Sequence, residues 1–320
     1  MSAESSLSLK RIVQAARVVD PVFLNSPQFV CEPLSAALGL DLLCKIDCLN
    51  PIRSFKGRGA DFFAHTLGSV DRPLVAASAG NFGQGLAYAC RRRDWPLILF
   101  AATTANPLKI ARMRALGADV RLVGEDFDAA KLAARAFAAD KKLRFVEDGR
   151  EPAIAEGAGT IGLELCKWPE PIDAVLVPIG NGALVNGVGR WFKSHSPATR
   201  VVGVVAAAAP SMRLSWLAGR RVTTERADSI ADGIAVREPV EEALAEMAHA
   251  VDDVVEVSEA ELTDAVRQTF AALGLAVEAS GAASLAAAVK LQEKLRGQLV
   301  AALFCGGNIT HAQFARCQGA

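Results

Sequence analysis

Short runs of apolar and β-branched residues alternate with longer stretches of helical apolar spacing from residue 72 onward. A turn rich in glycine, asparagine or serine separates each run from the stretch after it. This alternation predicts strands and helices that follow one another along the chain, which is the α/β class. The expected strands cover residues 73–77, 96–101, 119–123, 174–178, 201–205, 253–257 and 300–304.

Most of these runs are apolar at successive positions, so both faces of each strand need to be covered. Strands of this kind are typical of a parallel sheet between two layers of helices. Two helix starts are also visible. Asn106 precedes Pro107 as a cap before a first-turn proline, and Ser258 and Glu261 have the spacing of a capping box. We therefore expect a largely parallel sheet flanked by helices.

The chain is balanced in charge, with 35 basic and 35 acidic residues among 320. This balance and the lack of long blocks of like charge argue against nucleic-acid and anionic-membrane partners. A small neutral or zwitterionic molecule is the expected partner. The longest apolar stretch, residues 201–209, is too short to cross a bilayer. The length favours one globular unit with two lobes.

The cysteine pattern indicates a reducing compartment. Seven cysteines, an odd number, are scattered along the chain, so a disulfide framework is not expected and the protein should be cytoplasmic. Cys44 and Cys48 could suggest half of a metal site. No second pair completes that site, and buried structural cysteines are the preferred interpretation.

One glycine-rich turn has the properties of an anion site. The apolar run 174–178 leads into small residues and then into a predicted helix. Backbone N–H groups can converge there, and the helix N-terminus adds partial positive charge, so a phosphate could bind without a basic side chain. The dinucleotide fingerprint and the Walker A loop both fail on their spacing. An ordinary tight turn remains the alternative. The turn comprises Gly180, Asn181, Gly182, Ala183 and Leu184.

A lysine stands in an unusual context at residues 50–60. Lys56 follows Ser54 and Phe55 and lies between glycines at a predicted helix start. An amine held among an apolar neighbour and close backbone can form a Schiff base with an aldehyde. The alternative is a solvated lysine, which is the usual state of this residue.

Two further strand-to-helix turns carry polar or thiol groups. The first follows the strand at 73–77 and could cradle a carboxylate. The second ends the last predicted strand with Cys305, at the edge where α/β sheets hold ligands. Taken singly, both also fit ordinary turns, and Cys305 also fits a small buried hydrophobe. The first turn comprises Ser78, Ala79, Gly80, Asn81 and Phe82.

Together and in this order, these segments resemble the fold-type II pyridoxal-phosphate enzymes, specifically the serine/threonine dehydratase family that also contains serine racemase. The resemblance runs from about residue 25 to residue 310. Residues 54–56 look like the Schiff-base motif, 78–81 like the substrate loop and 180–184 like the phosphate cradle. Further similar blocks lie at 157–164, 231–235 and 278–283.

The resemblance implies a two-lobed α/β fold like that of the tryptophan synthase β-subunit. Residues 1–50 and 146–320 would form a large lobe, with residues 51–145 inserted as a small lobe. Pyridoxal 5'-phosphate would be the cofactor, and Lys56 the catalytic residue that carries it and removes the α-proton of the substrate. The implied cofactor-binding residues are Phe55, Lys56, Asn81, Gly180, Asn181, Gly182, Ala183, Leu184 and Cys305, and the implied substrate-binding residues are Ser78, Ala79, Gly80, Asn81 and Phe82.

The activity implied is that of an ammonia-lyase, or dehydratase. It would convert a β-hydroxy amino acid such as L-threonine or L-serine into a 2-oxo acid and ammonia, and the protein would be a homodimer. A β-replacement enzyme of the synthase or sulfhydrylase type is the first alternative. A pyridoxal-phosphate-binding protein without turnover is the second.

Several residues depart from the family pattern or qualify it. Asn181 stands where the cradle usually has glycine. Phe82 stands where members often have histidine, which leaves the preferred amino acid open and could favour one with an apolar or aromatic β-substituent. Members that bind a divalent cation have carboxylates in the region matching residues 206–212, and none occurs there, so we expect no divalent metal. Ala79 occupies the position of the serine that acts in racemases. We therefore expect a poor racemase.

Cys305 matches the position of a residue that faces the pyridine nitrogen of the cofactor. A thiol at neutral pH donates a weak hydrogen bond and carries no charge, unlike a carboxylate. The ring would then be a modest electron sink, which favours elimination over transamination.

Overall fold

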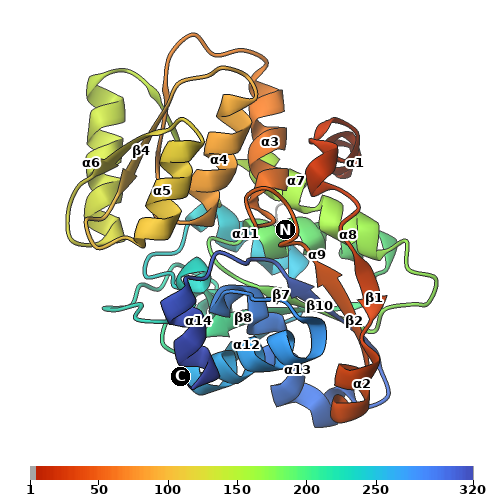
Figure 1. Ribbon diagram of the computed structural model, residues 1–320. Helices are drawn as coiled ribbons and strands as arrows, with labels where there is room; N and C mark the ends of the chain where they lie inside the picture. The colour runs from red at the N-terminus through yellow and green to blue at the C-terminus, as the bar shows by residue number, and fades with distance from the viewer. Residues whose placement is uncertain (1–4, 320) are drawn as a thin grey trace.

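The computed structural model describes residues 5–319 and contains two sheets. The larger has six strands in the order β1-β2-β10-β7-β8-β9, and the smaller has four in the order β5-β4-β3-β6. In Figure 1 the small sheet and its helices lie above the large one. The strands of the large sheet are β1 (Gln28–Val30), β2 (Asp41–Ile46), β7 (Ala174–Pro178), β8 (Arg200–Ala206), β9 (Asp253–Val257) and β10 (Leu299–Phe304), and those of the small sheet are β3 (Leu74–Ala77), β4 (Leu97–Ala101), β5 (Asp119–Leu122) and β6 (Arg144–Val146).

Helices cover both faces of the sheets. The α-helices are α1 (Leu9–Val18), α2 (Glu32–Leu38), α3 (Lys56–Leu67), α4 (Asn81–Arg91), α5 (Pro107–Ala115), α6 (Phe127–Asp140), α7 (Pro152–Ala158), α8 (Thr160–Leu165), α9 (Ala183–His195), α10 (Ser211–Ala218), α11 (Glu241–Ala250), α12 (Glu259–Leu273), α13 (Ala279–Leu295) and α14 (His311–Gln318), with short 3₁₀ turns η1 (Pro21–Phe23) and η2 (Asp232–Ile234). None of the described helices has the length and apolarity needed to cross a membrane.

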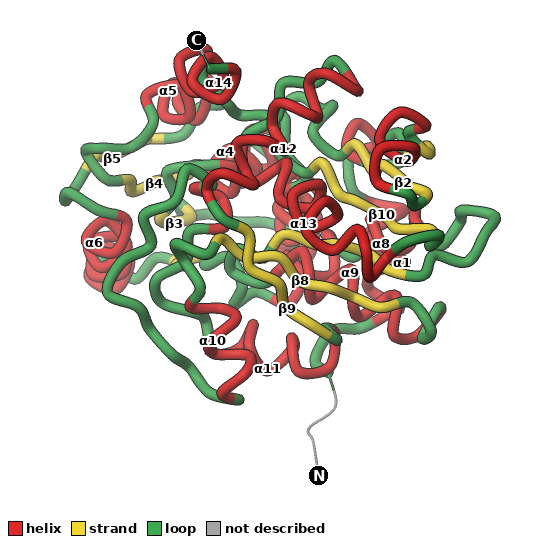
Figure 2. The backbone as a smooth tube through the Cα atoms, turned by 90° about the horizontal axis from the view of Figure 1, so that it is seen from below, coloured by secondary structure: helices red, strands yellow, loops and turns green. Residues whose placement is uncertain are grey.

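The arrangement follows from the fully apolar strands. All of β7 is buried, and its alternate side chains enter different cores. Leu176 packs into the core formed with α12 and α13, whereas Val175 and Val177 pack with α8 and α9. Figure 2 shows α12 and α13 on one side of these strands and α9 on the other. The predicted α/β class and the flanking helices are therefore confirmed.

Strand direction also agrees with the prediction. Only β1 and β2 pair antiparallel among the described strands, and the other pairs are parallel. Each strand predicted from the sequence is present within about one residue of its expected ends. Strands β1, β2 and β6 were not predicted. Helix α5 begins at Pro107 with Asn106 as its cap, and the capping box of Ser258 and Glu261 starts α12, as expected.

The chain leaves the large sheet after β2, builds the small sheet between residues 74 and 146, and returns at β7. The expected lobes, 1–50 with 146–320 and 51–145, stay a prediction as exact boundaries. Residues 1–4 of the first segment lie outside the described part of the chain.

A buried ionic cluster fixes the start of α3 against the large sheet. The Arg58 guanidinium, fully buried, lies 2.6 Å from an Asp47 carboxylate oxygen and 2.6 Å from a Glu164 carboxylate oxygen. The Lys45 ammonium lies 2.6 Å from the other oxygen of Glu164. Burial alone would raise the pKa of Glu164, but the hydrogen bonds and charge of Arg58 lower it below its usual value. Two cations and two anions thus balance within the core.

Candidate active site

A single cavity of about 600 Å³ lies between the two sheets. It collects every site residue proposed from the sequence, although the chain separates them by as many as 250 positions. Those lining the cavity are Phe55, Lys56, Ser78, Ala79, Gly80, Asn81, Phe82, Gly180, Asn181, Gly182, Ala183, Leu184 and Cys305.

Parallel strands explain this convergence. Strand β3 ends at Ala77, β7 at Pro178 and β10 at Phe304, and each is followed directly by one of the proposed segments. The carboxyl ends of parallel strands are where α/β sheets place ligands. A bridge between Ser54 and Gly306 ties the lysine segment to the end of β10.

The turn after β7 has the shape required for an anion cradle. Gly182 caps α9 with φ 89°, in the left-handed region that favours glycine. A side chain at Gly180 would place its Cβ only 2.5 Å from the Gly233 carbonyl oxygen. The first N–H groups of a helix have no acceptor within the helix. A phosphate at this helix end would therefore be held by backbone N–H groups and the helix dipole.

Lys56 is the first residue of α3, and its side chain lies in the cavity. Its ammonium is ion-paired with Asp148, whose side chain is 8% exposed, and lies 4.7 Å from the centre of the Phe55 ring. The backbone N–H of Phe55 donates to the Cys305 carbonyl at 3.1 Å. These contacts hold the segment that carries the Lys56 amine beside Cys305, the residue that follows β10.

The turn after β3 presents backbone N–H groups at the start of α4. The Ser78 hydroxyl accepts hydrogen bonds from the N–H groups of Gly83 at 2.9 Å and Gly80 at 3.3 Å, so it faces the turn itself. Asn81 is held at both ends of its amide. Its oxygen accepts from Asn308 at 2.7 Å, and its nitrogen donates to Glu278.

Cys305 is buried directly after β10. Burial, the charge of Glu278 and then the charge of Asp47 raise the pKa of its thiol. The group is therefore a neutral thiol at physiological pH. This state agrees with the weak, uncharged donor proposed for this position.

Several charged residues that line the cavity were not assigned a role from the sequence. Four of them are Lys109, Asp148, Asp232 and Glu278. Asp232 and Glu278 fall in blocks that carry the family resemblance, which was a usable signal. Lys109 and Asp148 gave no such signal, because single charged residues usually lie on a solvated surface.

Lys109 is the most completely enclosed of these charges, with a side chain 2% exposed. Its ammonium lies 2.6 Å from Asp232 and 3.1 Å from Glu278. Burial would lower the pKa of Lys109, but the two carboxylates outweigh it and the pKa is raised. This amine is therefore a fixed cation that joins α5 of the small sheet to η2 and to Glu278, the residue before α13.

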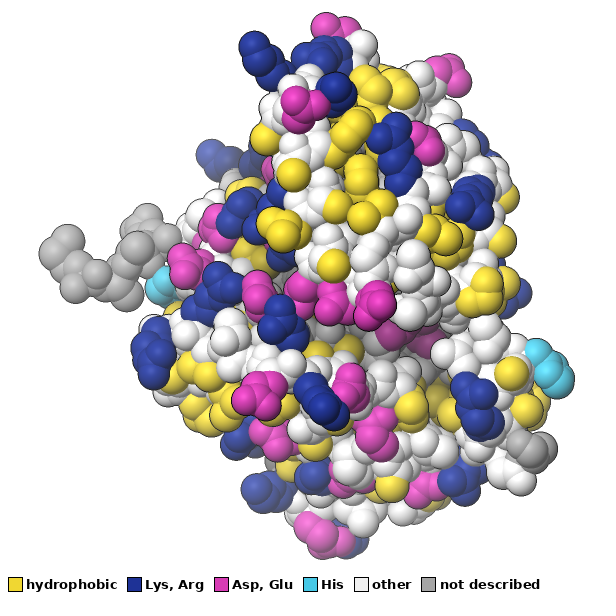
Figure 3. Space-filling view, turned by 90° about the vertical axis from the view of Figure 1, so that its left-hand side faces the viewer, with side chains coloured by type: hydrophobic (Ala, Val, Ile, Leu, Met, Phe, Trp, Pro, Cys, Tyr) yellow, Lys and Arg dark blue, Asp and Glu magenta, His cyan; other side chains and the backbone are white. Residues whose placement is uncertain are grey.

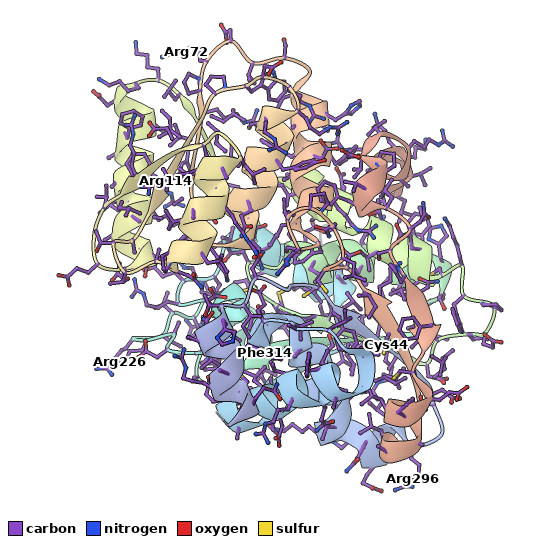
Figure 4. All side chains as sticks on the ribbon, in the orientation of Figure 1. Cys44, Arg72, Arg114, Arg226, Arg296 and Phe314 are labelled. Carbon is purple, nitrogen blue, oxygen red and sulfur yellow. The ribbon has the colours of Figure 1, made fainter. Side chains whose placement is uncertain are left out.

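The mouth of the cavity lies between the start of α6 and two loops at 225–229 and 232–238. Arg237 of the second loop is ion-paired with Asp128 of α6, which links the two sides. Arg226 of the first loop points away from the body of the protein (Figure 4). Figure 3 shows acidic side chains in a band across the middle of one face, where the surface is hollowed.

These groups fit a cofactor that carries a phosphate and an aldehyde. The helix end at Gly182 suits the phosphate, Lys56 supplies an amine, and Cys305 supplies a neutral donor. Among residues 5–319, His, Cys, Asp and Glu side chains form no group of three that could hold a metal ion. The expected lack of a divalent metal stays a prediction.

Comparison with known proteins gives the same class of fold. The family model described as "Pyridoxal-phosphate dependent enzyme" matches residues 19–306. The solved structure of a threonine deaminase from T.th. is similar with a TM-score of 0.88 and 32% identity, over 95% of this chain and 99% of that one.

Two curated relatives are similar over most of this chain. Threonine dehydratase 2 of Solanum lycopersicum, described as biosynthetic and chloroplastic, is 33% identical over 93% of the chain. The L-threonine ammonia-lyase of Thermotoga maritima is 34% identical over 95% of the chain. The match spans 50% of the tomato protein and 76% of the Thermotoga protein.

Proposed function

The chain belongs to the family of pyridoxal-phosphate-dependent enzymes, and from this we propose that it is an ammonia-lyase, or dehydratase, of β-hydroxy amino acids. The substrate would be an amino acid such as L-threonine or L-serine, and the products a 2-oxo acid and ammonia. The observation that carries the proposal is the convergence of an amine, an anion cradle, a loop of N–H groups and a neutral thiol in one cavity. Relatives named for threonine ammonia-lyase activity support it.

Each group has a distinct task in this reaction. Pyridoxal phosphate, when bound, supplies an aldehyde that joins amines and a ring that withdraws electrons from the α-carbon. Lys56 would bind that aldehyde in a Schiff base through its Nζ atom and, once displaced, accept the α-proton at the same atom. The N–H groups after β3 would hold the substrate carboxylate, and those at the start of α9 the phosphate. Asn81 would orient the ring, and Cys305 would donate to its nitrogen without adding charge.

The test is to incubate the protein with pyridoxal phosphate and single amino acids, then measure 2-oxo acid and ammonia. L-threonine or L-serine should give both products in equal amounts. The variant K56A should give neither. If a new amino acid forms only when sulfide is added, the protein is a β-replacement enzyme and not an ammonia-lyase. If the bound cofactor absorbs visible light but no amino acid is turned over, the protein binds pyridoxal phosphate without catalysis.

Assembly and location belong to the same proposal. We propose a homodimer on the family resemblance, which light scattering after gel filtration tests. A cytoplasmic location is supported by the seven cysteines, all unpaired in the structure. The lobes at 1–50 with 146–320 and at 51–145 are proposed on the two-sheet arrangement.

A further inference from the structure

A side pocket of about 60 Å³ adjoins the main cavity where β3 and β6 end. The rings of Phe82, Phe127 and Phe145 line it, and Asp148 lies on the wall that it shares with the main cavity. Its size suits a small substituent of a bound amino acid. Its wall also carries Glu147 and Lys131, which are ion-paired with each other. Aromatic rings beside a carboxylate such as Asp148 attract cations.

Asp148 has fewer partners than a buried carboxylate normally has. One oxygen is ion-paired with Lys56, whereas the other is buried without a hydrogen-bond partner in the structure. The nearby cationic side chains are ion-paired with a different carboxylate. Lys131 and Arg135 are both paired with the neighbouring Glu147, and their hydrogen bonds outweigh burial and lower its pKa.

The pairing of Asp148 conflicts with the role proposed for Lys56. While the Lys56 nitrogen is bonded to the cofactor aldehyde, it carries at most one proton in place of the three of a free ammonium, so it offers Asp148 fewer donors. A buried carboxylate that loses donors is destabilised until another cation or donor takes their place. The substrate is the molecule that enters this cavity, so it can supply that cation.

We propose that Asp148 is a specificity residue that recognises a positively charged β-substituent, and that amino acids of the 2,3-diaminopropionate class are substrates preferred over L-serine. This inference rests on the proposed function, because it assumes that the cavity binds amino acids beside the cofactor. Phe82 and its two aromatic neighbours add cation–π attraction in the same pocket.

The same elimination then releases the β-amine in place of a hydroxyl group. The α-proton leaves to Lys56, the bond between Cβ and the side-chain nitrogen breaks, and that nitrogen leaves as ammonia. Water hydrolyses the remaining enamine to pyruvate and a second ammonia. Each 2,3-diaminopropionate consumed with one water therefore yields one pyruvate and two ammonia molecules, with no oxidant or reductant.

The first experiment measures binding separately from turnover. The variant K56A, loaded with pyridoxal phosphate, is titrated with L-2,3-diaminopropionate and with L-serine while the visible absorbance of the cofactor is followed. The pH is kept low enough for the side-chain amine to be protonated. We expect the diamino acid to bind at least about thirtyfold more tightly, since a close buried charge pair contributes about 2 kcal/mol or more. Equal affinities would overturn the inference.

The second experiment assigns this preference to Asp148. In K56A/D148N the preference should fall at least about thirtyfold, whereas K56A/D128N should keep it. Asp128 lines the same cavity, so D128N removes an equal charge that is committed to Arg237. Equal losses in both variants would show a general effect of charge and refute a specific role. The affinity for L-serine in K56A/D148N reports whether the site remains folded.

Activity of the wild type distinguishes this inference from the proposed function. Pyruvate from L-serine with no preference for the diamino acid would leave the dehydratase proposal intact and sink the inference. If K56A binds the diamino acid tightly but the wild type turns over no amino acid, the inference about Asp148 stands and the proposed function is wrong.

Discussion

Replacing Arg58 with methionine should destabilise the protein by about 3–5 kcal/mol, because it leaves buried carboxylates without their main partner. The guanidinium is fully buried and lies within 2.6 Å of both Asp47 and Glu164. In R58M only Lys45 would remain to neutralise two carboxylates. Methionine fills much of the same volume, so the loss would be mainly electrostatic.

Urea unfolding of the cofactor-free protein measures this loss without a contribution from ligand binding. Arg296 pairs with Glu293 with side chains 64% and 72% exposed, so R296M is the matched control and should change stability by about 1 kcal/mol or less. The double variant R58M/E164Q removes one orphaned charge. Its loss in the free energy of unfolding should be about 0.5–3 kcal/mol smaller than the sum of the losses in the two single variants.

The loss should also depend on pH. The pKa of Glu164 is lowered in the folded protein, so its stabilising contribution is present above its unfolded pKa of about 4.3 and is lost as pH falls through the lowered value. R58M lacks that contribution. The difference in stability between wild type and R58M should therefore narrow as the pH falls below about 4.3. A difference under about 1 kcal/mol at pH 7, or one that stays constant with pH, would refute this account of the cluster.

Three further predictions concern the site. K56A should abolish turnover, and borohydride reduction of the wild type should attach the cofactor to Lys56; mapping to another lysine would show the assignment to be wrong. C305D should protonate the ring nitrogen and change the visible spectrum and the product ratio; identical spectra would mean that Cys305 does not face the ring. The wild type should form little D-serine from L-serine, because Ala79 has no exchangeable proton. The Lys109 amine lies near this loop, 4.0 Å from the place where a Cβ on Gly80 would be, but two carboxylates hold it. A79S should raise inversion in chiral analysis, and D-serine accumulating as fast as pyruvate in the wild type would contradict the reasoning.

Most of the strands that the sequence predicted are buried on both faces, whereas the edge strands β5 and β9 are partly exposed. The apolar runs of the buried strands are visible without any knowledge of the partners. Strand β2 carries Lys45 within it, and that charge is tolerated only because Glu164 lies beside it in the fold. Strand β1 lies at a sheet edge with Phe29 41% exposed, and β6 has three residues. Neither offers the long apolar pattern on which the prediction depends.

The candidate site divides in a similar way. Turns such as the one at Gly182 were predictable because their chemistry is local and depends on backbone conformation. Asp148 and Lys109 acquire meaning only through residues far along the chain. Asp148 meets Lys56 from 92 positions away, and Lys109 meets Asp232 from 123 positions away. Residue type and spacing alone could not reveal these pairs.

A cradle made of backbone responds to mutation differently from a site made of charged side chains. At Gly180 and Gly182 no charge can be removed, so reversing a nearby charge should matter less than adding a single methyl group. A mutational survey of this protein would then find sensitive positions among residues that have no functional group at all. Selection on such a site acts on shape, and compensating changes must come from the elements packed against it, such as the Gly233 backbone that faces Gly180.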